Sequence, residues 1–347
     1  MAEQLPFAVI GAGFMGRNLA LVGAALPYAR CVGVADPDEG RARDLAEACH
    51  APAYRDYETM LARERPVAVL VATPETHHRE PAVAAAQAGC HLLVEKPLAT
   101  TLEDADAILK ACNQAGVKLM TGYILRFEPA YALIQAAVAE GSIGQFLSAY
   151  ARRNAGIREA RRLGGRCSVL TYLAVHDIDQ ILWYHPVPVA RVWARGLRGR
   201  VWQELGVHDY TWTQMEFADG ALGVVESGWG LPEAWASWQR PQNWGGFGDV
   251  QMNVLGTEGV LNLNLTPMDL RGCDQEGWKF PDTRHWPRVH GQLAGAVKGE
   301  VEHFFACILK DRDPLVTGLD GRRSLEVALA AQRSIELDAP VPLPLQV

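Results

Sequence analysis

The chain has 347 residues, of which 49% are hydrophobic and 21% are charged, as is typical of a globular protein with two domains. Its formal net charge of −7 gives no overall attraction to nucleic acid or to an anionic membrane, so neither is expected as a partner. The seven cysteines are scattered and form no CxxC pair, and no signal peptide or membrane-spanning run is found, so we expect a cytoplasmic protein without disulfides.

Strand-like and helix-like segments alternate along the first third of the chain. Strands are predicted at 7–13, 31–36, 68–73, 90–96 and 118–123, and helices at 17–26, 38–49, 80–89 and 102–116. This alternation is typical of a doubly wound parallel sheet with right-handed crossovers. We therefore predict an α/β chain whose first domain, residues 1–122, is a Rossmann-type dinucleotide-binding domain.

The pattern changes after residue 122. A helix is predicted at 129–141, and residues 146–265 are rich in Trp, Thr, Val and Gly, with alternating runs at 210–217 and 222–229. This favours an α+β domain over 123–347, built on a large, open, mostly antiparallel sheet and ending in helices, the last of which can pack back on the first domain. Because a broad Trp-rich sheet face is costly to leave in water, we expect a homodimer or homotetramer formed through this sheet.

The first motif that carries chemistry is GAGFMG at residues 11–16. Gly11, Gly13 and Gly16 have the G-x-G-x-x-G spacing between a predicted strand and a predicted helix. The first glycine permits a tight turn, the second lets the backbone approach a pyrophosphate, and the third lets the helix pack on the strand. Glycine-rich turns are common, but in this context the motif favours a dinucleotide whose phosphates lie at the helix N-terminus.

Asp36 ends the second predicted strand, twenty residues beyond Gly16. An acid there can accept hydrogen bonds from the adenosine ribose, although an Asp-Pro pair is also common in turns and helix caps. With the glycine motif, Asp36 favours NAD, because its carboxylate would repel the 2′-phosphate of NADP. Arg41 and Arg43 keep NADP open as the less favoured cofactor.

The stretch VEKPLA at residues 94–99 places Lys96 at the carboxyl end of the fourth predicted strand, directly before Pro97. A solvated turn would tolerate Glu95 and Lys96. However, ligands of such sheets bind outside the carboxyl ends of the strands, and a following proline restricts the lysine backbone. We therefore predict that Lys96 is directed toward a substrate.

The chain resembles the glucose-fructose oxidoreductase, inositol dehydrogenase and rhizopine-catabolism (Gfo/Idh/MocA) family in five motifs: GAGFMG (11–16), ATPETHH (72–78), VEKPLA (94–99), GYILRFEPAY (122–131) and AVHDIDQILWY (174–184). The resemblance covers nearly the whole chain. It implies NAD-dependent oxidation of hydroxyl groups, with Lys96 and His176 as catalytic residues. It also implies substrate-binding roles for Arg126 and Asp179, and cofactor-binding roles for Gly11, Gly13, Phe14, Met15, Gly16, Asp36, Thr73, Pro74, His77, Glu95 and Lys96.

Simpler interpretations stand beside these roles. His176 lies in an apolar run, where a buried histidine is usually structural, and Asp177 is as easily structural as substrate-binding. His77 and His78 can be surface residues, and Arg126 can be an ion-pair partner. The histidines lack the spacing of metal ligands, so no metal site is predicted.

Two features of the sequence bear on which substrate the protein binds. Many family members that resemble inositol dehydrogenase have Asp four residues before the catalytic His, where this chain has Tyr172. On a helix, Tyr172 would lie one turn from His176, so we expect a ring that shapes the pocket or, less favoured, a catalytic hydroxyl. Residues 152–166 hold six arginines and one glutamate. Such a run is usually a solvated face or subunit contact, but Arg152 and Arg153 could bind an anionic sugar derivative.

The sequence therefore predicts an NAD-dependent dehydrogenase that acts on a sugar, a sugar derivative or a cyclitol. Two alternatives remain at this point. One is a non-catalytic NAD-binding regulator or sensor that has kept the fold, and the other is an enzyme with tightly held NADP that couples oxidation of one sugar to reduction of another.

Overall fold

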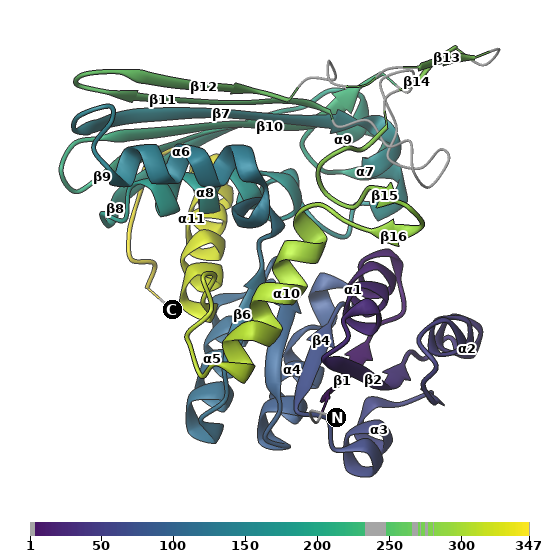
Figure 1. The fold of residues 1–347 in the computed structure, drawn as a ribbon. Coiled ribbons are helices and arrows are strands. Elements are labelled where there is room, and N and C mark those ends of the chain that lie inside the picture. The colour runs from purple at the N-terminus through teal and green to yellow at the C-terminus, as the bar shows by residue number, and fades with distance from the viewer. Residues whose placement is uncertain are drawn as a thin grey trace. The chain divides into compact units, whose positions relative to one another are not determined.

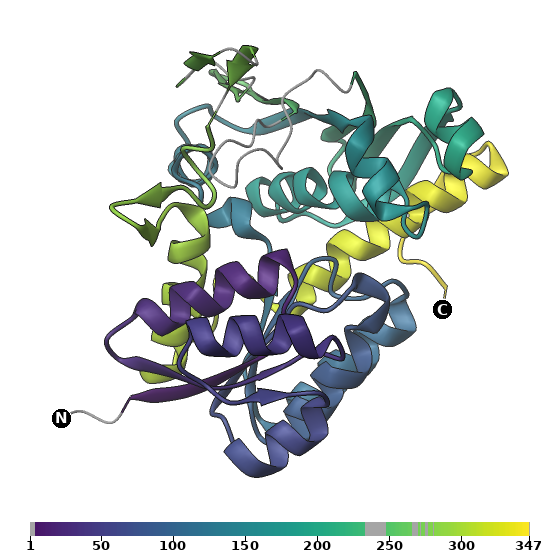
Figure 2. The same ribbon diagram turned by 90° about the vertical axis from the view of Figure 1, so that its right-hand side faces the viewer.

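The computed structural model describes residues 4–232, 248–265, 270, 272–274, 277–279 and 281–346. It contains two compact units, the first made of Met1–Phe127 and Arg284–Arg322 and the second of Glu128–Thr283 and Arg323–Val347. Both can be followed by colour in Figures 1 and 2. Among the described residues, no helix has the length and apolar character needed to cross a membrane.

The first unit is built on a six-stranded sheet in the order β3-β2-β1-β4-β5-β6, in which every neighbouring pair is parallel. The doubly wound parallel sheet predicted from the sequence is thus confirmed, and β3 is a strand that the prediction did not include. The strands are β1 (Leu5–Ile10), β2 (Ala29–Ala35), β3 (Ala53–Tyr54), β4 (Ala68–Val71), β5 (His91–Glu95) and β6 (Leu119–Gly122).

Helices cover both faces of this sheet. Helices α1, α2 and α10 pack with one another on one face, and α3, α4 and α5 on the other (Figure 2). All residues of β4 are buried, because helices on both faces leave no side of a central parallel strand in water. The helices are α1 (Phe14–Ala25), α2 (Glu39–Ala48), α3 (Tyr57–Glu64), α4 (Arg79–Gln87), α5 (Leu102–Ala115) and α10 (Ala296–Leu309), with short 3₁₀ helices η1 (Glu75–His77) and η2 (Ile124–Phe127).

A second stretch of chain, Arg284–Arg322, completes the first unit. It begins with a small hairpin of β15 (Arg288–Val289) and β16 (Gln292–Leu293), which packs on α1, and continues into α10. The ring of Phe305 on α10 packs on Phe7 of β1, with 5.2 Å between ring centroids. Apolar contacts therefore connect this late segment to the first strand.

The second unit is built on a seven-stranded sheet in the order β12-β11-β7-β10-β9-β8-β17. Strands β7 and β10 are parallel and all other neighbours are antiparallel, so the predicted open, mostly antiparallel sheet is confirmed. The strands are β7 (Phe146–Gly156), β8 (Val189–Leu197), β9 (Tyr210–Phe217), β10 (Leu222–Leu231), β11 (Asp249–Gly256), β12 (Val260–Asn264) and β17 (Val341–Pro342), and a separate hairpin joins β13 (Gly272–Asp274) to β14 (Gly277–Lys279).

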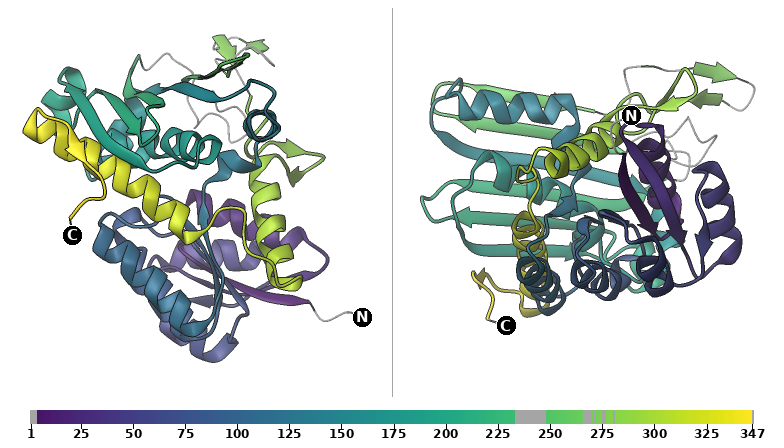
Figure 3. Two further views of the ribbon diagram at one scale, coloured as in Figure 1. Left: turned by 90° about the vertical axis from the view of Figure 1, so that its left-hand side faces the viewer. Right: turned by 60° about the horizontal axis from the view of Figure 1, so that its bottom comes forward.

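One face of the large sheet is covered by helices (Figures 1 and 3). On β9, Thr211, Thr213 and Met215 are buried, whereas the alternate residues Trp212 and Gln214 are exposed, as the two-residue period of a strand requires. The helices are α6 (Pro129–Ala139), α7 (Ile157–Leu163), α8 (Val175–Tyr184), α9 (Arg200–Leu205) and α11 (Gly318–Leu337), the last of which begins in the first unit, and the π-helical turn η3 (Leu170–Ala174) directly precedes α8.

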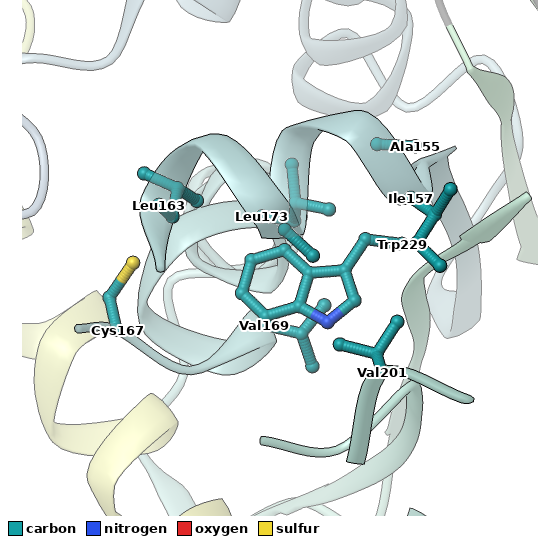
Figure 4. Packing of buried hydrophobic residues seen from close by; sticks show 9 residues of the cluster. Ala155, Ile157, Leu163, Cys167, Val169, Leu173, Val201 and Trp229 are labelled. Atoms are coloured by element: carbon teal, nitrogen blue, oxygen red, sulfur yellow. The ribbon is translucent and has the colours of Figure 1, made fainter. Parts of the chain in front are cut away.

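A local core forms around Trp229, which has no exposed surface (Figure 4). The indole Nε1 donates a hydrogen bond to the carbonyl of His208 at 2.9 Å, so the polar edge of the ring is satisfied. The cluster consists of Ala155, Ile157, Ala160, Leu163, Cys167, Val169, Leu173, Val201 and Trp229. These contacts fix α7 and the turn before α8 against the sheet.

Candidate active site

The carboxyl ends of β1, β4 and β5 meet at one edge of the sheet in the first unit. Because β1 and β4 are neighbours while the chain leaves them in opposite directions across the sheet, this edge is the topological switch point at which ligands of such folds bind. The glycine motif follows β1, Thr73 and Pro74 follow β4, and Lys96 follows β5. The predicted cofactor residues of three separate motifs thus share one edge.

Each glycine of the motif has its own geometric reason. Gly11 has a φ of 96°, and a Cβ there would lie 2.6 Å from the backbone of Ala72. A Cβ on Gly16 would overlap the Gly11 carbonyl. The Cβ position of Gly13 is open, and Gly13 is the N-cap of α1 and supplies no side chain to the free backbone N–H groups of the first turn. This arrangement fits a pyrophosphate beside the positive end of α1.

Asp36 lies directly after β2, and its carboxyl group is buried against the glycine loop. Its Oδ2 accepts a hydrogen bond from the backbone N–H of Ala12 at 2.7 Å, and its Oδ1 accepts one from the N–H of Asp38 at 2.8 Å. Each carboxylate oxygen has two lone-pair sites, so the group can still accept hydrogen bonds from ribose hydroxyls. The residues present therefore fit the adenosine half of NAD.

Replacing Asp36 by Ser is expected to weaken NAD binding by about 10- to 100-fold, the usual worth of a hydrogen bond to a charged group, while NADP binding changes less. The reason is that Ser removes both the acceptor for the ribose and the charge that repels a 2′-phosphate. Titration of both dinucleotides by fluorescence measures the ratio of affinities. Asp38→Ser, at an exposed helix cap two residues away, should keep the parent ratio, and parent protein that prefers NADP would contradict the assignment.

Strand β5 ends at Glu95, and the turn after it holds Lys96 and the cis Lys96–Pro97 bond. Glu95 is buried, and its Oε2 accepts a hydrogen bond from the Lys96 N–H at 3.2 Å. Gly122 on the neighbouring strand β6 makes room for this side chain, because a Cβ there would lie 3.3 Å from the Glu95 carboxyl carbon. The Lys96 side chain is half-buried at the strand end.

The two adjacent histidines after β4 differ sharply. His77 is exposed, and its carbonyl accepts a hydrogen bond from Thr73 Oγ1 at 2.8 Å. His78 is only 1% exposed, and its ring lies between the carbonyls of Thr73 and Pro97. The sequence could not tell these two histidines apart, because they have the same chemistry and differ only in burial.

Glu300 on α10 is a further buried acid of the first unit, and no sequence motif pointed to it. It has no exposed surface, and neither carboxyl oxygen has a hydrogen-bond partner among the described residues. Burial, and then the charge of Glu95, raise the pKa of Glu300 well above its ordinary value. Burial also raises the pKa of Glu95 to about 7, against the opposing effect of Lys96. The two acids therefore do not both ionise readily at neutral pH.

We expect the stability of the dinucleotide-free protein to fall as pH rises from 5 to 9, and to fall less in Glu300→Gln. Folded Glu300 keeps a proton that the unfolded chain loses above 4.5, its ordinary pKa. Each further pH unit then lowers the free energy of unfolding by about 1.4 kcal/mol until the group ionises in the fold. Denaturant unfolding at pH 5, 7 and 9 measures this. Glu302→Gln, on the same helix but partly exposed, is the control, and equal slopes in parent and Glu300→Gln would contradict the expectation.

Aromatic side chains flank the start of α1. Phe14 is 55% exposed, and its ring meets that of Trp286 edge-on, with 5.3 Å between centroids. Trp286 lies in the late segment of the first unit, more than 250 residues after the glycine motif, so no local motif links the two. Met15, the next residue of α1, is half-buried. Phe14, exposed beside the glycine turn, and the half-buried Trp286 form an apolar surface of the kind that fits a dinucleotide.

Arg126 lies on η2 and is 4% exposed. Its Nη1 donates a hydrogen bond to the Leu315 carbonyl at 3.1 Å, and its Nη2 lies 3.6 Å from Asp320 Oδ1. Arg126 is thus an ion-pair partner whose guanidinium holds the segment after α10 to η2, and its role toward substrate remains a prediction.

In the second unit, His176, Asp177 and Asp179 all lie on α8. His176 is half-buried, whereas both aspartates have no exposed surface. Asp179 Oδ2 accepts a hydrogen bond from Gln180 Nε2 at 3.3 Å. The roles of His176 and Asp179 toward substrate remain predictions.

Asp177 forms a buried ion pair with Arg153 of β7. The contacts are bidentate, with Arg153 Nε 2.7 Å from Asp177 Oδ2 and Nη2 2.9 Å from Oδ1. Arg153 Nη2 also donates to the hydroxyl of Tyr131 at 3.0 Å. Arg153 and Asp177 therefore neutralise each other's charge inside the domain, which favours the structural interpretation of Asp177 that the sequence left open.

The arginine-rich run does not form one surface. Arg152 and Arg153 are neighbours on β7, so their side chains point to opposite faces of the sheet, and Arg152 Nη2 donates to Asp249 Oδ1 at 2.8 Å. Arg161 makes a two-bond pair with Glu204, and Arg162 pairs with Glu159. A strand that becomes a helix within fifteen residues disperses the charges that look contiguous in the sequence.

Tyr172 lies in the π-helical turn η3, so the expected single α-helical turn between it and His176 is not formed. Its hydroxyl donates to Glu159 Oε1 and accepts from Arg162 Nη2, both at 2.7 Å. Its ring packs near Trp229, with 6.3 Å between centroids. Burial, and then the charge of Glu159, raise the pKa of the Tyr172 phenol above its ordinary value, so the hydroxyl keeps its proton at neutral pH and cannot act as a base.

Tyr172→Phe is therefore expected to leave kcat within roughly tenfold of the parent, less than the loss of a general base. It should lower the free energy of unfolding by about 1–2 kcal/mol, because Glu159 and Arg162 each lose a hydrogen bond. Steady-state kinetics and denaturant unfolding measure the two effects. A fall in kcat comparable to that of a missing catalytic base, with the fold intact, would show that the hydroxyl is catalytic.

Within the described part of the chain, no three His, Cys, Asp or Glu side chains are grouped so that they could hold a metal ion. The glycine turn and the Asp36 carboxylate at the sheet edge are groups that fit a dinucleotide.

Comparison with known proteins agrees with this geometry. Residues 5–123 match the family model described as "Oxidoreductase family, NAD-binding Rossmann fold", and residues 131–262 match the "GFO/IDH/MocA C-terminal domain". The chain is 28% identical over 356 positions to scyllo-inositol 2-dehydrogenase (NAD(+)) of Bacillus subtilis, covering 99% of this chain and 97% of that protein. It is 28% identical to D-apiose dehydrogenase of Paraburkholderia graminis, covering 94% and 86%.

Solved structures share the fold over the full length. GenD2 from gentamicin A biosynthesis, in complex with NAD, superposes with a TM-score of 0.83 at 25% identity, covering 99% of this chain and 98% of that one. Scyllo-inositol dehydrogenase from Lactobacillus casei, with bound NAD(H) and scyllo-inositol, has a TM-score of 0.83 at 21% identity, covering 98% and 99%. The two domain matches, in the order that the motifs predict, show that the chain belongs to the Gfo/Idh/MocA family of NAD-binding oxidoreductases.

Proposed function

We propose that the protein is an NAD-dependent dehydrogenase that oxidises a hydroxyl-bearing carbon of a sugar or cyclitol. The observation that carries this proposal is the shared sheet edge of the first unit, where the glycine turn, Asp36 and Lys96 follow three strands of one sheet. The printed activities of full-length relatives, an inositol dehydrogenase and an apiose dehydrogenase, support the substrate class. In this proposal the first unit binds dinucleotide and the second binds substrate.

Bound NAD supplies a hydride acceptor, and the chain must supply a group for the hydroxyl proton. Lys96 is the proposed group, since it stands at the strand end beside a buried acid and is held in a turn. Glu95 is proposed to bind the nicotinamide ribose, and Thr73, Pro74 and His77 to line the cofactor. His176 is proposed as the proton-handling residue of the second unit, as the family resemblance implies.

The proposed substrate is neutral. Four arginines of the run that had suggested an anionic sugar, Arg152, Arg153, Arg161 and Arg162, make ion pairs with acids of the same unit. An arginine already paired has less to offer an incoming carboxylate or phosphate, because binding would have to break an existing pair. Neutral polyols therefore fit the second unit better than sugar acids or phosphates.

A second copy of the chain is the proposed partner of the uncovered face of the large sheet. The strand register places Trp193, Trp212, Leu222, Leu255 and Val260 on this face, and each is at least 36% exposed. An open sheet face that exposes large apolar side chains, here among polar neighbours such as Arg195 and Gln214, is typical of subunit interfaces. A homodimer formed there, which can associate further into a tetramer, would cover it, and sedimentation velocity measures its presence.

The cytoplasm is the proposed compartment. Six cysteines among the described residues, Cys31, Cys49, Cys90, Cys112, Cys167 and Cys307, are free and buried, as expected of a protein from a reducing environment.

The test is a panel of neutral sugars and cyclitols, including scyllo-inositol, myo-inositol and D-apiose, with sugar acids and sugar phosphates as comparison. Each is incubated with NAD and followed by the absorbance of NADH. Turnover of a neutral polyol is expected. Binding of NAD without turnover of any member would favour the non-catalytic regulator, and tightly held NADP in the purified protein would favour the sugar–sugar oxidoreductase.

A further inference from the structure

His78 joins two turns at the cofactor edge of the first unit. Its Nδ1 lies 2.9 Å from the carbonyl oxygen of Pro97, and its Nε2 lies 3.0 Å from that of Thr73. Thr73 follows β4, and Pro97 follows β5 and is bonded directly to Lys96. A single imidazole ring thus bridges the turn predicted to line the cofactor and the turn that carries Lys96.

The ring is well isolated from solvent, and its partners can only accept hydrogen bonds. A neutral imidazole has one N–H donor and the imidazolium has two, so two carbonyl partners demand more protons than the neutral ring holds. Burial lowers the pKa of His78, while the carbonyls of Thr73 and Pro97 and the charge of Glu75 oppose that effect. The ring is therefore neutral at pH 7.5 and donates to one carbonyl at a time.

We propose that His78 is a positioning residue, which sets the place of Lys96 by holding the Pro97 carbonyl to the Thr73 turn. The Lys96 N–H also donates a hydrogen bond of 3.2 Å to the Glu95 carboxylate, so the residue is held from both sides of its own peptide unit. Without the His78 ring, the turn after β5 loses a side-chain contact with the turn after β4, and the peptide chain alone no longer fixes where Pro97 and Lys96 lie. A displacement of about 1 Å at a reacting group can lower turnover about 100-fold.

The first experiment compares His78→Leu and His78→Gln, and for its kinetic readout it rests on the proposed dehydrogenase activity. His78→Leu is expected to lower kcat by about 10- to 100-fold with the best substrate of the panel, while the affinity for NADH changes less than about threefold. His78→Gln keeps one donor and should recover part of kcat. His50→Asn, at an exposed position of the same unit, is the control. Unchanged kcat in His78→Leu, or equal kcat in the two variants, would overturn the proposal.

The second experiment needs no substrate. The sequence has few lysines, so reductive ¹³C-dimethylation gives a simple NMR spectrum in which Lys96 is assigned by its loss in Lys96→Arg; the lysines are Lys96, Lys110, Lys118, Lys279, Lys298 and Lys310. Addition of NADH should shift the Lys96 resonance in the parent, and His78→Gln should change that shift while leaving the others in place. A Lys96 resonance identical in parent and variant, free and with NADH, would overturn the proposal even if the protein oxidises no sugar.

If His78→Leu does not fold, ¹⁵N-histidine labelling of the unaltered protein tests whether the His78 ring donates a hydrogen bond to a buried carbonyl. One ring nitrogen of His78 should carry a proton at pH 7.5 that exchanges slowly with solvent. Rapid exchange of that proton would contradict a ring held between two carbonyls.

Discussion

Replacing Lys96 by Met is expected to lower kcat by about 10²- to 10⁴-fold while the affinity for NAD stays close to that of the parent. Hydride can leave a hydroxyl-bearing carbon only as the hydroxyl proton is accepted, and Met keeps the apolar length of the side chain without an amine. The glycine turn and Asp36, which hold the dinucleotide in our proposal, follow β1 and β2, whereas Lys96 follows β5. Rapid-mixing measurement of NADH formation and fluorescence titration of NAD separate the two effects.

The matched control is Lys110→Met, which removes an exposed lysine of α5 in the same unit. It should leave kcat, KM and NAD affinity at the parent values. If Lys96→Met retained turnover within a factor of a few, the proton would have to pass through another residue, and His176 of the second unit would be the first to test. If NAD binding were lost together with turnover, Lys96 would be a cofactor residue.

The cofactor edge was largely predictable from the sequence, because its parts are local. Gly11, Gly13 and Gly16 are recognised by spacing, and Asp36 and Lys96 by their positions at strand ends. A parallel sheet brings the carboxyl ends of its strands to one edge wherever the motifs lie in the chain. The parallel direction of the strands follows from the alternation of strand and helix, whereas their order in the sheet does not.

What the sequence did not disclose depends on pairs of residues far apart in the chain. Trp286 and Glu300 belong to the first unit, but they lie in residues 284–322, which come after most of the second unit in the sequence. His78 was indistinguishable from His77 until burial separated them. The arginine run illustrates the same limit, because the two-residue period of β7 sends Arg152 and Arg153 to opposite faces. Such a run can be interpreted as a surface only when its secondary structure is known.

The largest expected loss of stability concerns the buried pair of Arg153 and Asp177. Arg153→Met should lower the free energy of unfolding by about 3–5 kcal/mol, because it leaves the carboxylate of Asp177 buried without its cation. Asp177 has no exposed surface and Arg153 is 7% exposed, so water cannot replace the lost partner without opening the domain. Denaturant unfolding of the second unit, followed by tryptophan fluorescence, measures the change.

The control for burial comes from the same stretch of chain. Arg161 makes an equally well-formed two-bond pair with Glu204, at 2.9 and 3.0 Å, but both side chains are 34% exposed. Arg161→Met should therefore lower stability by only about 0–1 kcal/mol, since solvent screens an exposed pair and hydrates the remaining acid. Similar losses in the two variants would mean that geometry, and not burial, sets the strength of these pairs.

The double variant Arg153→Met/Asp177→Leu separates the value of the ion pair from the penalty for breaking it. Burying two charges is costly, and their attraction offsets that cost only when both are present. The double variant should therefore be more stable than Arg153→Met alone, although Tyr131 still loses its hydrogen bond to the guanidinium. If the losses of Arg153→Met and Asp177→Leu, each measured alone, instead add in the double variant, the two residues act independently and the ion pair does not account for their burial.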